Sequence, residues 1–468
     1  MPDNGARVLY TNTAAPVEDL GDIFSPLGEQ PYSQALERVQ QGLVQDLKRN
    51  VDDLSEQELK TKITQFIRDK NVKCDLPDQI ETLVDHIYHD MAGMSFISRE
   101  RVMEQPGFEE LDINSWDDVE VIVRGKRDKT DYQFLSPQHA QDIILRILRK
   151  TKTPFDVATP RATAELGPGI RITALRAPLV DDDVAVSASI RKVNMSTVSR
   201  EKLVGTALTE DMMTFLELCL THGVSMALSG GTGAGKTTLA GALLTHAAET
   251  LRIYTIEEGS REWNFITRDE ITGRVSNSII HTKTRPNEKD VTQNITQEEL
   301  VKDALRFDPQ IISPGEIRGR EAFEVMGVSN TGHTVITTVH ANNTLDTPKR
   351  IITLAKKAYD MSDTTLYDMC ASAFPILIHM EMGADGVRRV TEIREVTGYE
   401  QGDMKSHLLF EFKVFDNVYD GDVCTKVVGD FNRCGAPSDQ LIQQLLKKGA
   451  KRSELTPFTA TDEEEASA

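Results

Sequence analysis

The residues best suited to chemistry lie between positions 228 and 342. The stretch "SGGTGAGKTT" (229–238) places Gly230, Gly235, Lys236 and Thr237 in the pattern Gly-x-x-x-x-Gly-Lys-[Ser/Thr]. An apolar run at 224–228 precedes it and "KTTLAGALL" follows, which predicts a strand, a loop and a helix. The glycines let backbone N–H groups curl around phosphate oxygens, and the helix N-terminus adds partial positive charge. The stretch therefore predicts a site for a nucleoside triphosphate.

Within this loop the side chains have distinct expected roles. Lys236 should reach the β- and γ-phosphates, and the Thr237 hydroxyl should ligate Mg²⁺. An Asn-Lys-x-Asp motif for reading guanine is absent from the sequence, since "NEKD" at 287–290 has its lysine in the wrong place. ATP with Mg²⁺ is therefore the expected ligand. The nucleotide-binding residues of the loop are Gly230, Gly231, Thr232, Gly233, Ala234, Gly235, Lys236, Thr237 and Thr238.

Acidic, basic and histidine residues follow the loop in four clusters. Taken singly, each has a structural alternative: adjacent glutamates are often a solvated surface, arginines are often ion-paired, and a lone histidine is often structural. Their order after an intact phosphate loop favours a role in chemistry. The candidates are Glu257 and Glu258 in "YTIEEGSREW", Arg285 in "TRPNEKD" with Arg306 in "LVKDALRFDP", Glu316 and Arg318 in "SPGEIRG", and His333 and His340 in "NTGHTVITTVHANN".

This order resembles the secretion-traffic ATPases, the hexameric motors of type II and type IV secretion and of type IV pili. In that family the phosphate loop is followed by an acidic box, a Walker B strand ending in Gly-Glu, and a histidine box. The corresponding segments here are "GGTGAGKTT", "TIEEGSRE", "SPGEIRG" and "TGHTVITTVHAN". "RPNE", "DALRFDP" and "DGVRRVTEIREVTGYE" further resemble the tight-adherence pilus and conjugation-type branch. The resemblance covers about residues 100–400.

The resemblance implies roles that the residues alone do not. Glu316 would orient or activate the attacking water, and metal contacts would be shared between Thr237 and the acidic pair. Arg171 and Arg191, in "GPGIRITALRAP" and "SASIRKVN", would reach the nucleotide from an N-terminal domain. The catalytic set would be Glu316, Lys236, His340 and Arg285, in a homohexamer that meets platform proteins at the inner membrane.

Two positions depart from the family pattern. The residues before Gly315 are usually aliphatic, but here they are Ser313 and Pro314, and a proline removes a ladder donor, so the strand could end early. The acidic pair is Glu-Glu rather than Glu-Asp, which leaves the division of labour between Glu257 and Glu258 open.

Composition limits the class of protein. The chain has 468 residues, too many for one core, and a formal net charge of −20, which opposes direct binding of nucleic acid. Five scattered cysteines without a CxxC motif indicate reduced thiols. The sequence shows no targeting segment, and no run approaches the ~20 apolar residues that cross a bilayer. We expect a cytoplasmic protein without a membrane span, peripheral to the inner face of the cell membrane through its partners.

The elements around these motifs predict an α/β protein with a RecA-like P-loop core. We expect a flexible acidic tail at 1–33, a helical segment at 34–91 with capping-box spacing at Ser55 and Glu58, and a mixed α/β domain at 92–193. A linker at 194–207 leads to the ATPase domain at 208–420, which contains a hairpin signal at Asp385-Gly386. Residues 421–468 form a C-terminal extension with an acidic tail.

The expected function is an ATP-driven motor for pilus assembly or secretion. A conjugation ATPase, a translocase that grips DNA and a low-turnover nucleotide switch or scaffold remain alternatives. The shared motifs do not separate pilus from secretion and conjugation machines, or assembly from retraction.

Overall fold

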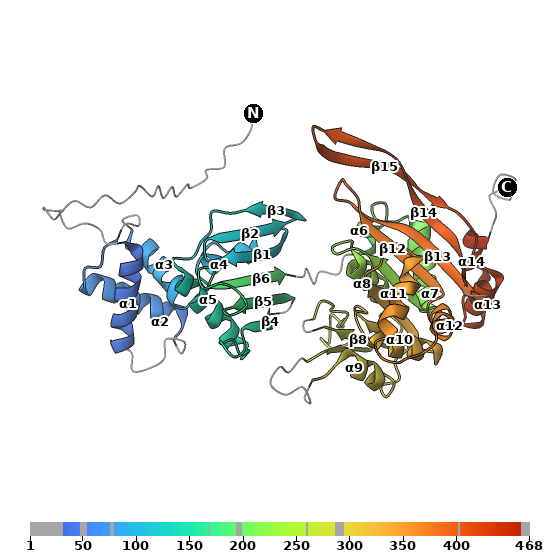
Figure 1. Ribbon diagram of the computed structural model, residues 1–468, viewed down its shortest axis with the longest axis horizontal. Helices are drawn as coiled ribbons and strands as arrows, with labels where there is room; N and C mark the ends of the chain where they lie inside the picture. The colour runs from blue at the N-terminus through green and yellow to red at the C-terminus, as the bar shows by residue number, and fades with distance from the viewer. Residues whose placement is uncertain are drawn as a thin grey trace. The chain divides into compact units, whose positions relative to one another are not determined.

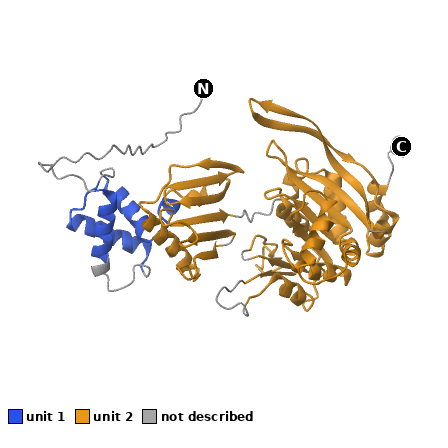
Figure 2. Ribbon diagram, viewed as in Figure 1, with its two compact units in different colours: residues 1–99 blue, residues 100–468 orange. Residues whose placement is uncertain are grey.

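The computed structural model describes residues 31–46, 54–74, 79–167, 169–192, 199–258, 261–285, 294–400 and 403–459. The chain divides into two compact units, 1–99 and 100–468 (Figure 2). The expected acidic tail at 1–33 falls almost wholly outside the described residues, as do the acidic end at 460–468 and residues 194–198 of the expected linker. None of the helices in the described ranges is long and apolar enough to cross a membrane.

The first unit is helical. It contains α1 (Tyr32–Asp46), α2 (Glu56–Asp69), α3 (Ile80–Met91) and α4 (Phe96–Arg99). The predicted capping box is confirmed, because Ser55 Oγ accepts the Glu58 N–H while the Glu58 carboxylate accepts the Ser55 N–H. The apolar stripes of α2 and α3 face each other in one core, which includes Leu59, Ile63 and Ile87.

A six-stranded antiparallel sheet begins the second unit. It is preceded by the short 3-10 turn η2 (Val102–Glu104), and its strands are β1 (Phe108–Ser115), β2 (Asp118–Val123), β3 (Lys126–Lys129), β4 (Arg161–Gly167), β5 (Ile170–Arg176) and β6 (Val186–Lys192). Their order is β3-β2-β1-β6-β5-β4. Helix α5 (Pro137–Lys150) starts at the N-cap Ser136 and buries Ile143, Ile144 and Ile147. This sheet carries Arg171 on β5 and Arg191 on β6.

The second sheet contains nine strands within the described residues, in the order β15-β14-β13-β12-β7-β11-β10-β8-β9. Its parallel part comprises β7 (Met226–Gly230), β8 (Ile253–Glu257), β9 (Ile279–Lys283), β10 (Ile311–Pro314), β11 (Thr334–Val339) and β12 (Ile376–Met382). The antiparallel part adds β13 (Arg388–Glu400), β14 (Asp403–Asp420) and β15 (Val423–Arg433). The predicted hairpin is confirmed between β12 and β13, where Gly386 adopts a φ of +75°.

Helices cover both faces of this sheet (Figure 1). One core holds Met226 and Leu228 of β7, and the other holds Ala227, as the period of two along a strand requires. The first core receives α7 (Glu210–Thr221), α8 (Lys236–Ala247), α13 (Asp439–Lys447) and α14 (Arg452–Thr459), and α6 (Arg200–Leu203) precedes them. The second receives α9 (Gln297–Ala304), α10 (Glu321–Asn330), α11 (Asp346–Ala355) and α12 (Asp363–Ala373). The predicted fold class, a P-loop α/β core with a smaller mixed domain and a helical segment, is confirmed.

The sheet continues past the expected domain end at residue 420, which falls at the turn between β14 and β15. Strand β15 pairs with β14 along Val423–Arg433. Phe458 of α14 packs against Phe215 of α7 with ring centroids 5.4 Å apart. The two C-terminal helices therefore belong to the core of the sheet.

Candidate nucleotide-binding and catalytic site

The phosphate loop has the geometry that its glycines permit. Strand β7 ends at Gly230, and α8 begins at Lys236. Gly230 has a φ of +150°, and a Cβ there would lie 2.2 Å from the carbonyl oxygen of Met380 on the adjacent strand β12. Only glycine fits this close approach. Gly233 and Gly235 also have positive φ angles, of +75° and +97°, which turn the loop into the helix.

Lys236 is buried, and it binds the loop's own carbonyl groups. Its Nζ donates to the carbonyl oxygens of Gly230 at 2.9 Å and of Gly231 at 2.8 Å. Burial lowers the pKa of Lys236, the Glu316 carboxylate opposes this effect, and the Arg318 guanidinium adds to it. Two of the three N–H donors of the ammonium group are thus used by the loop itself.

Four ionisable residues, Glu258, Glu316, Arg318 and His340, meet at the carboxyl edge of the parallel strands. Arg318 Nη2 donates to Glu316 at 2.8 Å, and its Nη1 donates to Glu258 at 2.7 Å. The Nε2 atom of His340 lies 3.1 Å from Glu316 Oε1, within ion-pair distance but without the geometry of a hydrogen bond. Burial lowers the pKa of His340, and Lys236 contributes to this shift. Residues that follow β8, β10 and β11 therefore surround one carboxylate next to the phosphate loop.

Pro314 is the last residue of β10 and pairs with Ile256 of β8. Pairing of β10 with β11 extends only to Ile312, and Ser313 Oγ donates to the Ile336 carbonyl beyond that point. Although Pro314 has no N–H to donate, the pairing of β10 with β8 continues to Gly315. The Gly315 N–H donates to the Ile256 carbonyl oxygen at 2.8 Å.

Glu257 differs from its neighbour Glu258. Its side chain is buried, and Oε2 accepts the backbone N–H groups of Glu262 and Trp263. Oε1 is buried without a hydrogen-bond partner in the described structure, and it lies 4.0 Å from His281 Nδ1. Burial raises the pKa of Glu257 to about 7. Glu257 thus holds residues 261–265, a segment that returns to the end of β8 and is called the returning loop below, whereas the half-exposed Glu258 pairs with Arg318.

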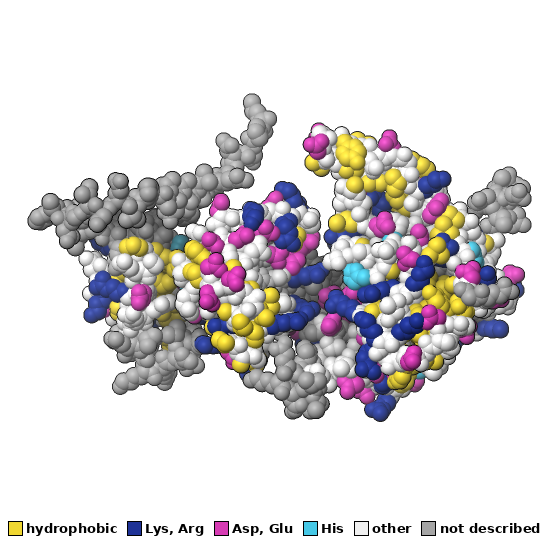
Figure 3. Space-filling model, viewed as in Figure 1, with side chains coloured by type: hydrophobic (Ala, Val, Ile, Leu, Met, Phe, Trp, Pro, Cys, Tyr) yellow, Lys and Arg dark blue, Asp and Glu magenta, His cyan; other side chains and the backbone are white. Residues whose placement is uncertain are grey.

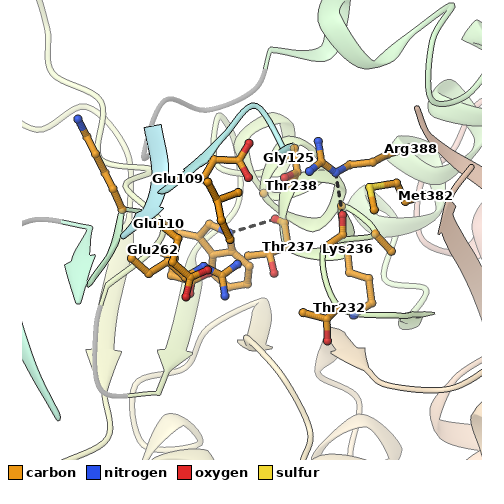
Figure 4. A pocket seen from close by; sticks show the side chains of 18 of the residues that line it. Glu109, Glu110, Gly125, Thr232, Lys236, Thr237, Thr238, Glu262, Met382 and Arg388 are labelled. Atoms are coloured by element: carbon orange, nitrogen blue, oxygen red, sulfur yellow. Dashed lines mark hydrogen bonds between the residues drawn. The ribbon is translucent and has the colours of Figure 1, made fainter. Parts of the chain in front are cut away.

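Trp263 and Arg388 were not identified from the sequence. The Trp263 indole N–H donates to the Thr237 carbonyl at 3.2 Å, and Arg388 Nε donates to the Gly233 carbonyl at 2.7 Å (Figure 4). The tryptophan lay in the segment that contains the acidic pair, but nothing in its spacing shows that the chain doubles back there. Arg388 lies more than 150 residues after the loop, so only the pairing of β12 with β7 could have placed it.

A cavity of about 470 Å³ opens over the phosphate loop (Figure 4). It is lined by Thr232 to Thr238, by Glu262 and Trp263 of the returning loop, and by Glu110 and Arg191 of the six-stranded sheet. Burial raises the pKa of Glu262, and the charges of Arg191 and Arg171 oppose that rise. Both arginines therefore act electrostatically on a residue of the cavity wall.

Glu316, Arg318 and His340 do not line this cavity but form a cluster whose charges act on Lys236. Three other predicted residues belong neither to the cavity lining nor to this cluster. Arg285 follows the edge strand β9, where its backbone pairs with Ile295 and its side chain is exposed. Arg306 is ion-paired with Asp303 at 2.9 Å and is largely exposed. His333 precedes β11 while His340 follows it, so about 20 Å of strand separates the two histidines.

The residues present fit a magnesium ion that is bound mainly through a nucleotide. The described ranges contain no group of three or more His, Cys, Asp or Glu residues placed to hold a metal. Magnesium usually takes one or two protein ligands together with phosphate oxygens and waters. Thr237, at the start of α8, is placed for this role, whereas one oxygen of Glu257 is occupied by backbone N–H groups.

The fold and the loop define a P-loop nucleotide-binding protein. The sequence profile of the family described as Type II/IV secretion system protein matches residues 161–373. This part of the chain is similar to that family, and the resemblance to secretion, pilus and conjugation ATPases drawn from the motifs is confirmed.

Several curated proteins are similar in sequence. A protein of Mycobacterium tuberculosis named for conjugal transfer is 32% identical over 175 residues, which are 37% of this chain and 47% of that protein. Conjugal transfer protein TrbB of Rhizobium radiobacter is 25% identical over 57% of this chain and 76% of its own length. Protein VirB11 of Agrobacterium fabrum is 28% identical over 37% of this chain and 49% of its own length. The chain thus spans about half the length of the Mycobacterium relative.

Solved structures show weaker likenesses. The VirB11 ATPase of Brucella suis, crystallised with sulphate, aligns at a TM-score of 0.32 and 20% identity over 64% of this chain and 92% of that one. The ATPase DotB of Legionella pneumophila aligns at a TM-score of 0.46 and 19% identity, over 65% of this chain and 81% of that one.

Proposed function

We propose that the chain is a Mg²⁺-dependent ATPase that works as a homohexameric motor. The observation that carries the proposal is the carboxylate of Glu316, held between Arg318 and His340 beside the buried Lys236. A switch protein needs only the phosphate loop, whereas hydrolysis also needs an oriented acceptor for the proton of water.

The chemistry follows from these positions. A triphosphate in the cavity would draw Lys236 from the carbonyls of Gly230 and Gly231 onto its β- and γ-phosphates. Bound to Thr237 and the phosphates, Mg²⁺ would neutralise charge on the phosphoryl oxygens. Glu316 would accept a proton as the water oxygen attacks the γ-phosphorus and the bond to the bridging oxygen of ADP breaks. The lowered pKa of His340 favours an uncharged imidazole at neutral pH, which leaves the Glu316 carboxylate able to accept the proton.

Hydrolysis would be coupled to movement through the six-stranded sheet. Arg191 of this sheet lines the cavity, and the charge of Arg171 acts on Glu262 of the same cavity. Glu165 of β4 also pairs with Lys283 of β9 at 2.5 Å. An arginine that binds the γ-phosphate bidentately would make the position of its sheet depend on the state of the nucleotide.

The machine that the motor serves would lie at the inner face of the cell membrane, reached from the cytoplasm through platform proteins. The first candidate is assembly of a tight-adherence type pilus or type IV or type II secretion; the segments "RPNE" and "DALRFDP" resemble the branch of tight-adherence pilus and conjugation-type ATPases and do not separate the two. A conjugation ATPase is the second candidate, since relatives are named for conjugal transfer. The net charge of −20 disfavours a motor that itself grips DNA.

The test is steady-state hydrolysis of ATP by the purified chain, with its mass measured in solution in the presence of a non-hydrolysed ATP analogue. The proposal expects Mg²⁺-dependent turnover and a hexamer. A strict monomer at high concentration would contradict the motor assembly, and binding without turnover would favour a switch. Stimulation by DNA with a steep salt dependence would instead favour the DNA-gripping translocase.

A further inference from the structure

The β14–β15 ribbon extends beyond the sheet to which it belongs (Figure 1). Strand β14 pairs with β13 only between Asp403 and Glu411, whereas it pairs with β15 from Phe410 to Asp420. Beyond residue 411 the two strands therefore pair only with each other. A two-stranded ribbon is at best marginally stable in water without further packing.

The base of the ribbon has such packing. Asp385, in the turn between β12 and β13, accepts the Val427 N–H at 2.9 Å and pairs with Arg389 at 2.8 Å. The Arg389 guanidinium lies 5.1 Å from the ring centroid of Phe412. The neighbouring Arg388 is the residue that donates to Gly233 in the phosphate loop. The base is thus fixed to the hairpin that borders the nucleotide cavity.

The outer part of the ribbon, residues 414–424, has apolar side chains in solvent. Figure 3 shows hydrophobic and acidic side chains together at its tip. The pairing of Asp420 with Val423 places these residues and Val418 on one face. Residues 415–424 contain three aspartates and no basic residue. The exposed apolar residues are Val414, Phe415, Val418, Tyr419 and Val423, with exposed fractions of 51%, 57%, 47%, 58% and 67%.

A surface of the opposite charge lies at the end of α5. Arg149, Lys150 and Lys152 are exposed, and no carboxylate pairs with them in the part of the chain that the structure describes. Residues 149–153, "RKTKT", contain no acid. An exposed apolar side chain, Val157 at 69%, follows in the same segment. The helix dipole favours cations at a helix C-terminus, but it does not account for an exposed valine beside them.

We propose that the outer ribbon, residues 414–424, of one copy docks on the α5 surface, residues 149–157, of a second copy. Both surfaces are exposed within one molecule, and they match in charge and in apolar character. The contact joins two different surfaces, so it is head-to-tail and generates a ring when the rotation between copies closes. This inference rests on the proposed self-assembly and names a surface for it. It would tie the ATPase sheet of one copy to the six-stranded sheet of the next.

Charge reversal in the full chain tests the pairing. One variant carries Asp416→Lys with Asp420→Lys, a second carries Arg149→Glu with Lys150→Glu, and a third combines both pairs. Each of the first two is expected to weaken association at least tenfold at low salt, and the combination to restore much of it. Asp403→Lys, at the base of the same strand, is the matched control and should assemble like wild type.

The readouts are mass in solution with an ATP analogue, and analogue binding by each variant. Normal assembly of both reversed variants would overturn the inference. Loss of assembly in each without recovery in the combination would also overturn it, because the two surfaces would then not meet. The variant Phe415→Ser with Val418→Ser, which keeps all charges, should weaken assembly too, and its thermal transition shows whether it folds. A wild-type chain that never assembles while binding the analogue would contradict the proposed hexamer itself.

Discussion

Replacement of Glu257 by glutamine separates a structural from a metal-binding role for the first acid of the pair. Its Oε2 accepts two backbone N–H groups, from Glu262 and Trp263, and its Oε1 is buried without a hydrogen-bond partner among the described residues. The amide oxygen of glutamine can accept the same two N–H groups. Glu257→Gln therefore removes the charge of this side chain and keeps its shape.

The sign of the effect follows from the raised pKa. The pKa of Glu257 moves from 4.5 to about 7 on burial, so the folded state holds the proton where the unfolded state has lost it. Stability therefore falls as the pH rises from about 4.5 to about 7, and the cost is complete above that range. The loss of folding free energy from ionising buried Glu257 is at most about 3 kcal/mol. Glutamine avoids this cost, and the lowered pKa of the adjacent His281, about 4, affects both proteins alike.

Thermal unfolding of wild type and Glu257→Gln near pH 8 and near pH 5 measures the effect. We expect the variant to unfold several degrees higher near pH 8, with a much smaller difference near pH 5. Turnover of ATP should change less than about tenfold, since we expect the carboxylate to hold the loop rather than the metal. An unchanged transition near pH 8 together with lost Mg²⁺-dependent turnover would refute this reasoning and make Glu257 a metal ligand.

Two further predictions concern the nucleotide. Lys236→Ala should abolish ATP binding or turnover, measured by titration and phosphate release, with a normal thermal transition; a folded variant with full activity would contradict the loop assignment. The single variants Arg171→Ala and Arg191→Ala should each lose about 2–4 kcal/mol of transition-state stabilisation. Turnover by each should therefore fall more than tenfold. Arg306→Ala, which removes only an exposed pair with Asp303, is the matched control and should turn over normally. Normal rates in the double variant of Arg171 and Arg191 would show that the six-stranded sheet is passive.

The sequence predicts the core of this protein because its signals are local. The spacing of Gly230, Gly235 and Lys236 requires a strand, a tight loop and a helix, and the structure has them in that order. The capping box at Ser55 and the hairpin at Gly386 are equally local, because each depends on a few adjacent residues.

The site was less predictable where it depends on long-range pairing. The order of the parallel strands brings His340 beside Glu316 and leaves His333 at the opposite edge, although both flank one strand in the sequence. The same pairing brings Arg388 to the phosphate loop. The different orientations of Glu257 and Glu258 depend on a loop that returns to the strand end, and no periodicity encodes such a return.

The central claim is that Glu316 makes this chain a hydrolase rather than a switch. The most direct test measures phosphate release by wild type and Glu316→Gln at saturating ATP and Mg²⁺, with ATP affinity measured for both. We expect wild type to turn over continuously, and the variant to bind ATP normally while its turnover falls about a hundredfold or more, as for loss of a general base. A variant that binds ATP and turns over as fast as wild type would contradict the account.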